Sequence, residues 1–254
     1  MSDQPNNSEP ESRGLSSEQV LDILTKGTID AAHGMMRWSS NYAFLVSVEQ
    51  DDTTLMAIYK PQQGERPLWD FPDGMLCKRE MASYLTSEVL GWSIVPPTVL
   101  REGPHGLGSV QFFIHHDPEM NYFEFDDSKV PQVMRICAFD YLVNNADRKG
   151  GHCLVDSEGH VWGIDHGITF HSSPKLRTVI WEFAGQAIPD ALLEDIDRLC
   201  AVTADINNAF RQALSELVTE REILAFQHRI NHLLKTRKYP EPGPGGPNYP
   251  WPPV

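Results

Sequence analysis

The hydrophobic pattern in the first half of the chain is typical of β-strands. Residues 41–50 and 53–61 are apolar, β-branched and aromatic, and the Asp51-Asp52 pair between them predicts a hairpin turn. Two further runs, 93–100 and 108–114, predict strands for the same reason. The first half is therefore expected to form a small sheet.

One helix is predicted within this strand-rich half. Residues 76–90 carry apolar side chains at helical spacing, and Gly91 follows as a C-terminal stop. At 100° per residue one arc of this helix is apolar, and it consists of Cys77, Met81, Tyr84, Leu85 and Val89. The arc predicts an amphipathic helix.

The pattern after Pro131 is mainly helical. A helix is predicted from Pro131 toward Val143, followed by two short strands around a Glu158-Gly159 turn. Three helices follow, and the last opens with a capping-box pattern at 219–222. Strands with one helix, followed by a helical region, predict an α+β protein with a strand-rich N-lobe at 17–114 and a small helical C-lobe at 115–238. A cleft between two such lobes is a natural ligand site.

Both ends of the chain lack periodicity. Residues 1–16 are polar and predict a disordered tail. Residues 239–254 contain seven prolines and three glycines, which exclude helix and sheet. We interpret this segment as a loose tail, with the alternative that it is a polyproline segment that docks on a partner through Tyr249 and Trp251.

Composition narrows the classes of partner. The chain has 21 Lys and Arg against 35 Asp and Glu, a net charge of −14, which argues against nucleic acid or an anionic membrane as the main partner. The four cysteines form no C-x-x-C pair, and no stretch approaches the ~18 apolar residues of a transmembrane helix. We expect a cytoplasmic protein with no stable membrane insertion and no nucleic acid partner.

The densest polar cluster is NNADRKGGH at 144–152, between a predicted helix and the short hairpin. Asp165, in the sequence GIDHG, follows Asp147 by 18 residues and comes directly after that hairpin. Two-lobed phosphoryl-transfer enzymes need this pair, because the first aspartate orients a proton on the nucleophile and the second holds magnesium. The alternative is a solvated turn, since Asn, Asp and Gly are turn residues.

A lysine on a predicted strand favours the phosphoryl-transfer interpretation. Lys60 shares the strand face of Met56 and Ile58, and a lysine on a half-buried face needs a partner. The following helix offers Glu80 and Glu88. A strand lysine paired with a helix glutamate positions nucleotide phosphates in kinases.

Three stretches carry a resemblance to a known family. They are YKPQQGERPLWDFPDGMLCKREMASYLTSEVLGWSIVPPTVL, VNNADRKGGHCLV and GIDHG. They resemble a bacterial family of mostly uncharacterised proteins whose catalytic region is similar to phosphatidylinositol 3-/4-kinases and HipA-type protein kinases. The resemblance covers residues 20–238 and implies the two-lobed, protein-kinase-like fold.

The resemblance also implies roles for individual residues. Lys60 matches the nucleotide-phosphate lysine, and Glu80, eleven residues before Gly91, matches its helix partner. Asp147 matches the catalytic aspartate, and Asp165 matches the metal-binding aspartate.

Two positions depart from the family pattern. His152 stands where the related kinases carry a magnesium-binding Asn, and imidazole is a poor ligand for Mg²⁺, so Mn²⁺ or a single metal ion is an alternative, as is a hydrogen bond from His152 to phosphate. Lys149 stands where lipid kinases commonly carry His, and its charge could stabilise the transferring phosphoryl group. Arg148 is interpreted as a structural anchor of the loop.

The remaining nucleotide contacts are the least specific. No glycine-rich phosphate motif is present. The corresponding turn would be 34–41, where Ser39 and Ser40 could bind phosphate, although ordinary hairpin chemistry explains them as well. Residues 110–114, with Gln111 among them, would form the adenine-facing linker.

Together these features predict an ATP-dependent phosphotransferase that uses Mg²⁺ or Mn²⁺. It would transfer the γ-phosphoryl group to an unidentified hydroxyl acceptor, which could be a small molecule, a lipid headgroup or a protein. The alternatives are a catalytically inactive nucleotide-binding or scaffolding module, and a nucleotidyl transferase that uses the same cleft. A zinc or iron site is a further alternative, because four histidines lie close together in sequence: His152, His160, His166 and His171.

Overall fold

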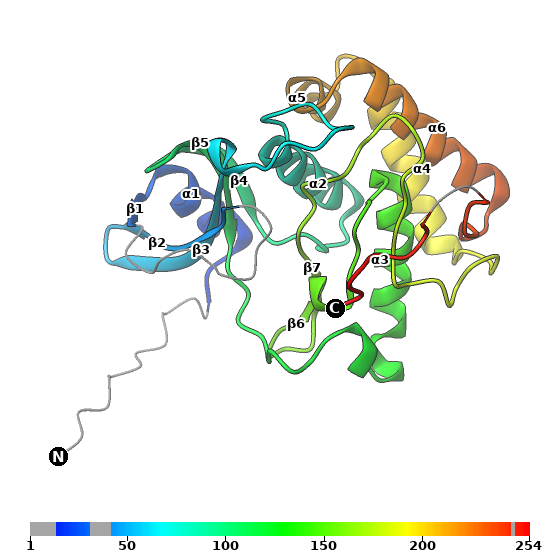
Figure 1. The fold of residues 1–254 in the computed structure, drawn as a ribbon, viewed down its shortest axis with the longest axis horizontal. Coiled ribbons are helices and arrows are strands. Elements are labelled where there is room, and N and C mark those ends of the chain that lie inside the picture. Colours follow the sequence, from blue (N-terminus) through cyan, green and yellow to red (C-terminus); the bar gives the residue numbers. More distant parts are fainter. Residues whose placement is uncertain (1–13, 31–41, 245–246) are drawn as a thin grey trace. The chain divides into compact units, whose positions relative to one another are not determined.

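The structure is a computed structural model that describes residues 14–30, 42–244 and 247–254 (Figure 1). The contacts divide the chain into two compact units. The first contains residues up to Arg66 together with 97–113, and the second contains 67–96 together with 114–254. The expected combination of strands and helices is confirmed, and the protein belongs to the α+β class.

The first unit is a five-stranded antiparallel sheet with the strand order β1-β2-β3-β5-β4. Its strands are β1 (Thr28–Asp30), β2 (Phe44–Gln50), β3 (Thr53–Pro61), β4 (Thr98–Gly103) and β5 (Gly106–Phe112). The predicted hairpin is confirmed, since β2 pairs with β3 and Asp51 occupies the left-handed region between them, with φ of 51°. A short acidic side chain tolerates this conformation better than most residues.

One helix of this unit was not predicted. Helix α1 (Ser17–Lys26) begins with a capping box in which Ser16 and Gln19 bind each other's backbone N–H groups. Its apolar side chains pack against one face of the sheet and form the core of the unit with Val46, Val48, Leu55, Ala57, Tyr59, Val99 and Val110. A sequence signal was therefore present at Ser16, where a serine is followed three residues later by glutamine.

The opposite face of the sheet carries the lysine. Along β3 the alternate residues Leu55, Ala57 and Tyr59 are fully buried, whereas Lys60 lies half-buried on the other face. The period-2 placement of Lys60 is confirmed. Ser109 stands opposite Lys60 on β5, so the lysine lies on a face with polar neighbours.

The second unit contains five α-helices and a short hairpin among its described residues. Its helices are α2 (Leu76–Leu90), α3 (Val130–Val143), α4 (Asp190–Ala204), α5 (Ala209–Leu217) and α6 (Glu220–Thr236), and its strands are β6 (Cys153–Val155) and β7 (Val161–Gly163). Helix α2 packs against α4 and α5, and α4 packs against α6. The predicted capping box is confirmed, because Thr219 and Glu222 bind each other's backbone N–H groups.

Helix α2 has the predicted bounds but not the expected amphipathic pattern. Gly91 ends it in the left-handed region, with φ of 67°, as expected. However, polar side chains are among its most deeply buried residues: Arg79, Glu80, Ser83, Thr86 and Ser87. Glu88, the other glutamate that this helix offers as a partner for Lys60, is exposed. The arc did not reveal this pattern, because Arg79, Glu80 and Ser83 contact partners far away in the chain.

The segment 67–96, which includes α2, groups with the helical unit, whereas the sequence pattern placed it in the strand-rich lobe. Helix α2 packs against α4 and α5, and Arg79 on α2 forms a buried ion pair with Glu222 on α6, 2.5 Å apart. The arginine also donates to the backbone carbonyl of Thr169. These contacts hold α2 against the last helix.

The proline-rich segment 239–254 contains no helix or strand among its described residues, as predicted. It is not a loose tail, because it packs on the second unit. Tyr239 is 1% exposed, Pro250 is buried, and the carbonyls of Asn248 and Pro253 accept hydrogen bonds from residues of the same unit. Trp251, in contrast, is 88% exposed.

Candidate functional site

The candidate catalytic loop begins where α3 ends. Asn144 caps the helix in the left-handed region, with φ of 55°, and its side chain binds the backbone of His171, Ser173 and Lys175. The side-chain oxygen of Asn145 then accepts a hydrogen bond from the backbone N–H of Asp147 at 3.0 Å. The two asparagines therefore turn the chain sharply and fix the position of the Asp147 backbone.

Asp147 lies in a partly desolvated environment beside a cation. Its side chain is 29% exposed, and its carboxylate lies 3.6 Å from the Lys149 ammonium group. Burial raises the pKa of Asp147, Lys149 opposes this shift, and the negative charge of Asp165 adds to it. A carboxylate with a raised pKa is a stronger proton acceptor than an ordinary surface aspartate.

His152 connects the two aspartates that the sequence singled out. Its Nδ1 lies 3.0 Å from the backbone carbonyl of Asp147, and its Nε2 lies 3.5 Å from a carboxylate oxygen of Asp165. The His152 side chain is 16% exposed, and that of Asp165 is 50% exposed. The structure therefore gathers Asp147, Lys149, His152 and Asp165 into one cluster in the second unit.

A buried arginine holds the two loops of this cluster together. Arg148 is fully buried and forms an ion pair with Asp140 of α3 at 2.9 Å. The same guanidinium donates to the carbonyls of His152 and Ile164, and one of its nitrogens lies 2.6 Å from Nε2 of His166. The predicted role of Arg148 as a structural anchor agrees with these contacts. They join the catalytic loop to the segment that carries Asp165.

Glu80 contacts the same segment. It is 2% exposed, and its carboxylate accepts the backbone N–H of His166 at 3.0 Å. Asp165 itself has a left-handed backbone conformation, with φ of 60°. The Glu80 carboxylate binds the residue that follows Asp165, and this contact stabilises the strained backbone conformation of Asp165.

These residues fit a divalent cation that is shared with a phosphate ligand. Among the described residues no three His, Cys, Asp or Glu side chains form a group that could hold a metal ion by themselves. Mg²⁺ is commonly bound through one or two carboxylates plus substrate phosphates, and Asp165 supplies such a carboxylate. His152 beside it adds a nitrogen that Mn²⁺ accepts more readily than Mg²⁺.

The predicted nucleotide contacts of the first unit have different outcomes. Gln111 is 6% exposed, and its side chain donates to Thr98 at 2.9 Å. Residues 110–112 belong to β5, which pairs with β3 on one side and β4 on the other. The chain passes from the first unit to the second between Phe113 and Ile114, so only the end of the predicted linker at 110–114 lies at the boundary. Ser39 and Ser40 lie outside the described residues.

One residue of the site, Asp140, was not singled out in the sequence, and three others have a different role from the one considered there. Asp140 and His166 complete the buried network around Arg148, and Asn144 and Asn145 orient the loop. The signal for Asp140 was a lone acid in an apolar helix, which requires a buried partner. The partner is Arg148, eight residues further along the chain. Helical spacing could not identify it, because Arg148 lies in the loop beyond the end of the helix.

Comparisons with known proteins match the region that contains this candidate site. The model of the phosphatidylinositol 3- and 4-kinase family matches residues 99–219, which include the whole catalytic loop and Asp165. The fold is similar to the crystal structure of a Helicobacter pylori proinflammatory kinase, CtkA, with a TM-score of 0.51 and 11% identity over 85% of this chain and 94% of that chain. The protein thus has a kinase-like fold, as expected.

Two sequence relatives narrow this class. The chain is 35% identical to Protein Rv2133c of Mycobacterium tuberculosis, and the match covers 91% of this chain and 94% of that protein. It is 25% identical to phosphatidylinositol 4-kinase gamma 2 of Arabidopsis thaliana, where the match covers 77% of this chain but 44% of the plant protein. The chain belongs to the bacterial family that includes Protein Rv2133c.

Proposed function

We propose that this protein is an ATP-dependent phosphotransferase that transfers the γ-phosphoryl group to a hydroxyl acceptor. The observation that carries the proposal is the cluster of Asp147, Lys149, His152 and Asp165. A carboxylate with a raised pKa lies beside a lysine, and a second aspartate lies beside the histidine that reaches back to the first. The match to the phosphatidylinositol 3- and 4-kinase family over this region supports the same chemistry.

In the proposed reaction Asp147 accepts the proton of the acceptor hydroxyl as its oxygen attacks the γ-phosphorus. The new P–O bond forms in line with the bond between the γ-phosphorus and the bridging oxygen. That bond breaks, and the bridging oxygen leaves as part of ADP. Lys149, 3.6 Å from Asp147, is placed to neutralise negative charge that develops on the transferring group. A divalent cation held by Asp165 and His152 would neutralise the charge of the phosphates.

Two further roles are inferred from the family resemblance. Lys60 is proposed to hold the α- and β-phosphates, and Glu80 to orient Lys60; the two residues belong to different units of the structure. The described contact of Glu80 with the His166 backbone adds a second role, the support of the segment that carries Asp165. The side chain of Gln111 already donates to Thr98. A nucleotide role for Gln111 would therefore also have to use its backbone groups.

The identity of the acceptor is left open by the proposal, because a fold does not determine a substrate. No helix in the described part of the chain is long and apolar enough to span a membrane. The acceptors to be tested are small alcohols, inositol lipids presented in vesicles, and serine- or threonine-containing proteins.

The test combines binding, turnover and product mass. Purified protein is mixed with ATP and either Mg²⁺ or Mn²⁺, and thermal stabilisation, ADP release and the mass added to the acceptor or to the protein are measured. We expect stabilisation, ADP release and the addition of one phosphoryl group. Stabilisation without turnover in either metal would instead indicate a nucleotide-binding module, an added nucleotidyl group would indicate a nucleotidyl transferase, and no stabilisation would refute nucleotide binding.

A further inference from the structure

The C-terminal proline-rich segment meets the catalytic loop. The backbone N–H of Gly150, three residues after Asp147, donates to the carbonyl of Pro253 at 2.7 Å. A side chain added at Gly151 would lie 3.8 Å from Val254, so this part of the loop and the end of the segment are in close proximity. Gly150 and Gly151 open the short turn that ends at His152.

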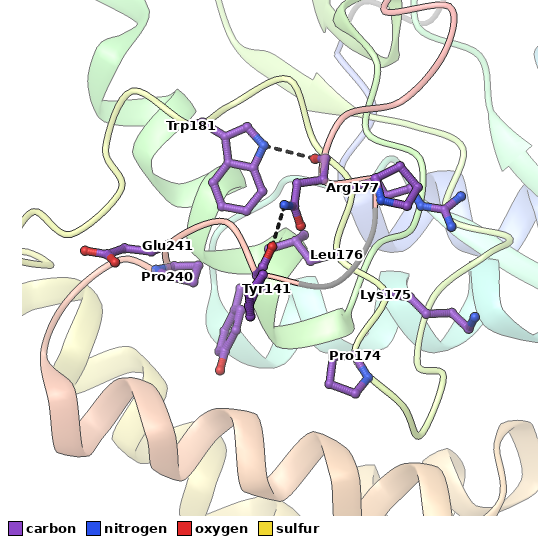
Figure 2. Close-up of a pocket in the computed structure, with 12 residues that line it drawn as sticks. Tyr141, Pro174, Lys175, Leu176, Arg177, Trp181, Pro240 and Glu241 are labelled. Atoms are coloured by element: carbon purple, nitrogen blue, oxygen red, sulfur yellow. Dashed lines mark hydrogen bonds between the residues drawn. The ribbon is translucent and has the colours of Figure 1, made fainter.

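The same segment also binds the chain that follows Asp165. The carbonyl of Asn248 accepts two hydrogen bonds, one from the backbone N–H of Thr178 at 3.1 Å and one from the indole N–H of Trp181 at 3.0 Å. Figure 2 shows the indole hydrogen bond as a dashed line at the upper wall of a pocket of about 400 Å³. The Asn248 side chain donates back to the carbonyl of Gly243 at 2.8 Å.

These two contacts are linked through the catalytic loop itself. Arg148 pairs with Thr178 as in a parallel strand, because its N–H donates to Arg177 at 2.9 Å and its carbonyl accepts from Val179 at 3.0 Å. The loop, residues 177–181 and residues 247–253 are therefore joined side by side by backbone hydrogen bonds. Proline suits the outer position, because it lacks an N–H group that would otherwise need a partner, and it limits the conformational entropy lost on docking.

We propose that residues 247–254 are a positioning arm of the catalytic loop. The arm holds the Gly150 N–H at one end and Thr178 and Trp181 at the other, and it thereby keeps the turn between Asp147 and His152 in register with the segment after Asp165. This inference rests on the proposed phosphotransferase function and adds to it a set of residues that touch no reacting group.

The test uses two single substitutions, each with a matched control. Trp181→Phe removes the indole donor to Asn248, and Trp92→Phe removes an indole donor to Asp195, at 2.7 Å, in the same unit. Asn248→Ala removes the bond to Gly243, and Asn231→Ala removes a bond of the same kind to Gln227, at 2.9 Å, on helix α6.

The readouts are amide hydrogen exchange in peptides that contain Gly150, kcat, and KM for ATP. We expect Trp181→Phe and Asn248→Ala to speed exchange at Gly150 and to lower kcat by about fivefold, the factor that corresponds to a net hydrogen bond of about 1 kcal/mol. KM for ATP should change by less than about twofold, because the arm contacts the loop and not the proposed nucleotide residues. The two controls should leave exchange at Gly150 and kcat unchanged.

Several results would overturn the arm. The first is unchanged exchange at Gly150 in Trp181→Phe and Asn248→Ala, and the second is an equal change of exchange and kcat in the two controls. The third is faster exchange with unchanged kcat, which would mean that the segment only packs on the surface. If the wild-type protein transfers no phosphoryl group to any acceptor, the proposed function fails. In that case faster exchange at Gly150 in the two variants alone still supports the arm, and unchanged exchange refutes it.

Discussion

The Nε2 atom of His152 lies 3.5 Å from a carboxylate oxygen of Asp165. The related kinases place an asparagine at the position of His152, so this contact is the main departure of the site from the family pattern. At this distance His152 and Asp165 could bind the same cation.

We expect His152→Asn to retain or increase turnover supported by Mg²⁺, because an amide oxygen is a better ligand for this hard cation than an imidazole nitrogen. Initial rates with Mg²⁺ and with Mn²⁺ measure the effect. His160→Asn is the control, since His160 precedes β7, contacts the carbonyl of Ser93 and is outside the cluster. Loss of activity with both metals would show instead that the imidazole has a role that asparagine cannot replace.

Asp147→Asn should lower kcat by at least about a hundredfold, the usual contribution of a general base. It should also raise the melting temperature at neutral pH. Burial raises the pKa of Asp147, so the charged form destabilises the folded state above that pKa, and the neutral amide removes this cost. Asp197→Asn, an exposed acid on α4, should change neither property. A variant with full activity would show that the assigned catalytic loop is wrong.

Arg148→Met should destabilise the fold by about 3 kcal/mol or more, because it leaves Asp140 buried without its ion-pair partner. Urea unfolding measures the loss. The matched control, Arg198→Met, removes an exposed ion pair with Asp195 and should cost less than about 1 kcal/mol. The double variant Arg148→Met/Asp140→Leu should recover part of the lost stability, and an equal loss in Arg148→Met and Arg198→Met would contradict the anchoring role.

The buried pair of Arg79 and Glu222 predicts a pH dependence of stability. Although burial alone would raise it, the ion pair holds the pKa of Glu222 below its usual value. A carboxyl with a lowered folded-state pKa contributes stability above its unfolded-state pKa of 4.5, and that contribution is lost as the pH falls through the folded-state value.

Unfolding free energies measured from pH 7 down to about pH 3 test this expectation. Glu222→Gln should be less stable than the wild type at pH 7, and the difference should shrink below the usual pKa of glutamate. Glu220→Gln removes a carboxylate that is 65% exposed in its pair with Arg211 and serves as the control with a small effect. A difference that stays constant across this range would refute the charge interaction.

Local sequence signals predicted most of the secondary structure. The hairpin around Asp51, the bounds of α2 and the capping box at Thr219 were all correct, because each depends on residues a few positions apart. Helix α1 also had its signal at Ser16 and Gln19. The proximity of the candidate site residues could also be expected, since three of the four lie within six consecutive positions.

What the sequence by itself determined, then, is the α+β class, the alternation that places Lys60 on the half-buried face of β3, and the composition of the catalytic loop. The tertiary structure alone decided that α2 buries Arg79 and Glu80, that Gln111 binds Thr98, and that the proline-rich segment returns to Gly150. The reason is physical. A backbone preference is set by near neighbours, whereas a buried polar group is stable only beside a partner, and that partner comes from a distant part of the chain.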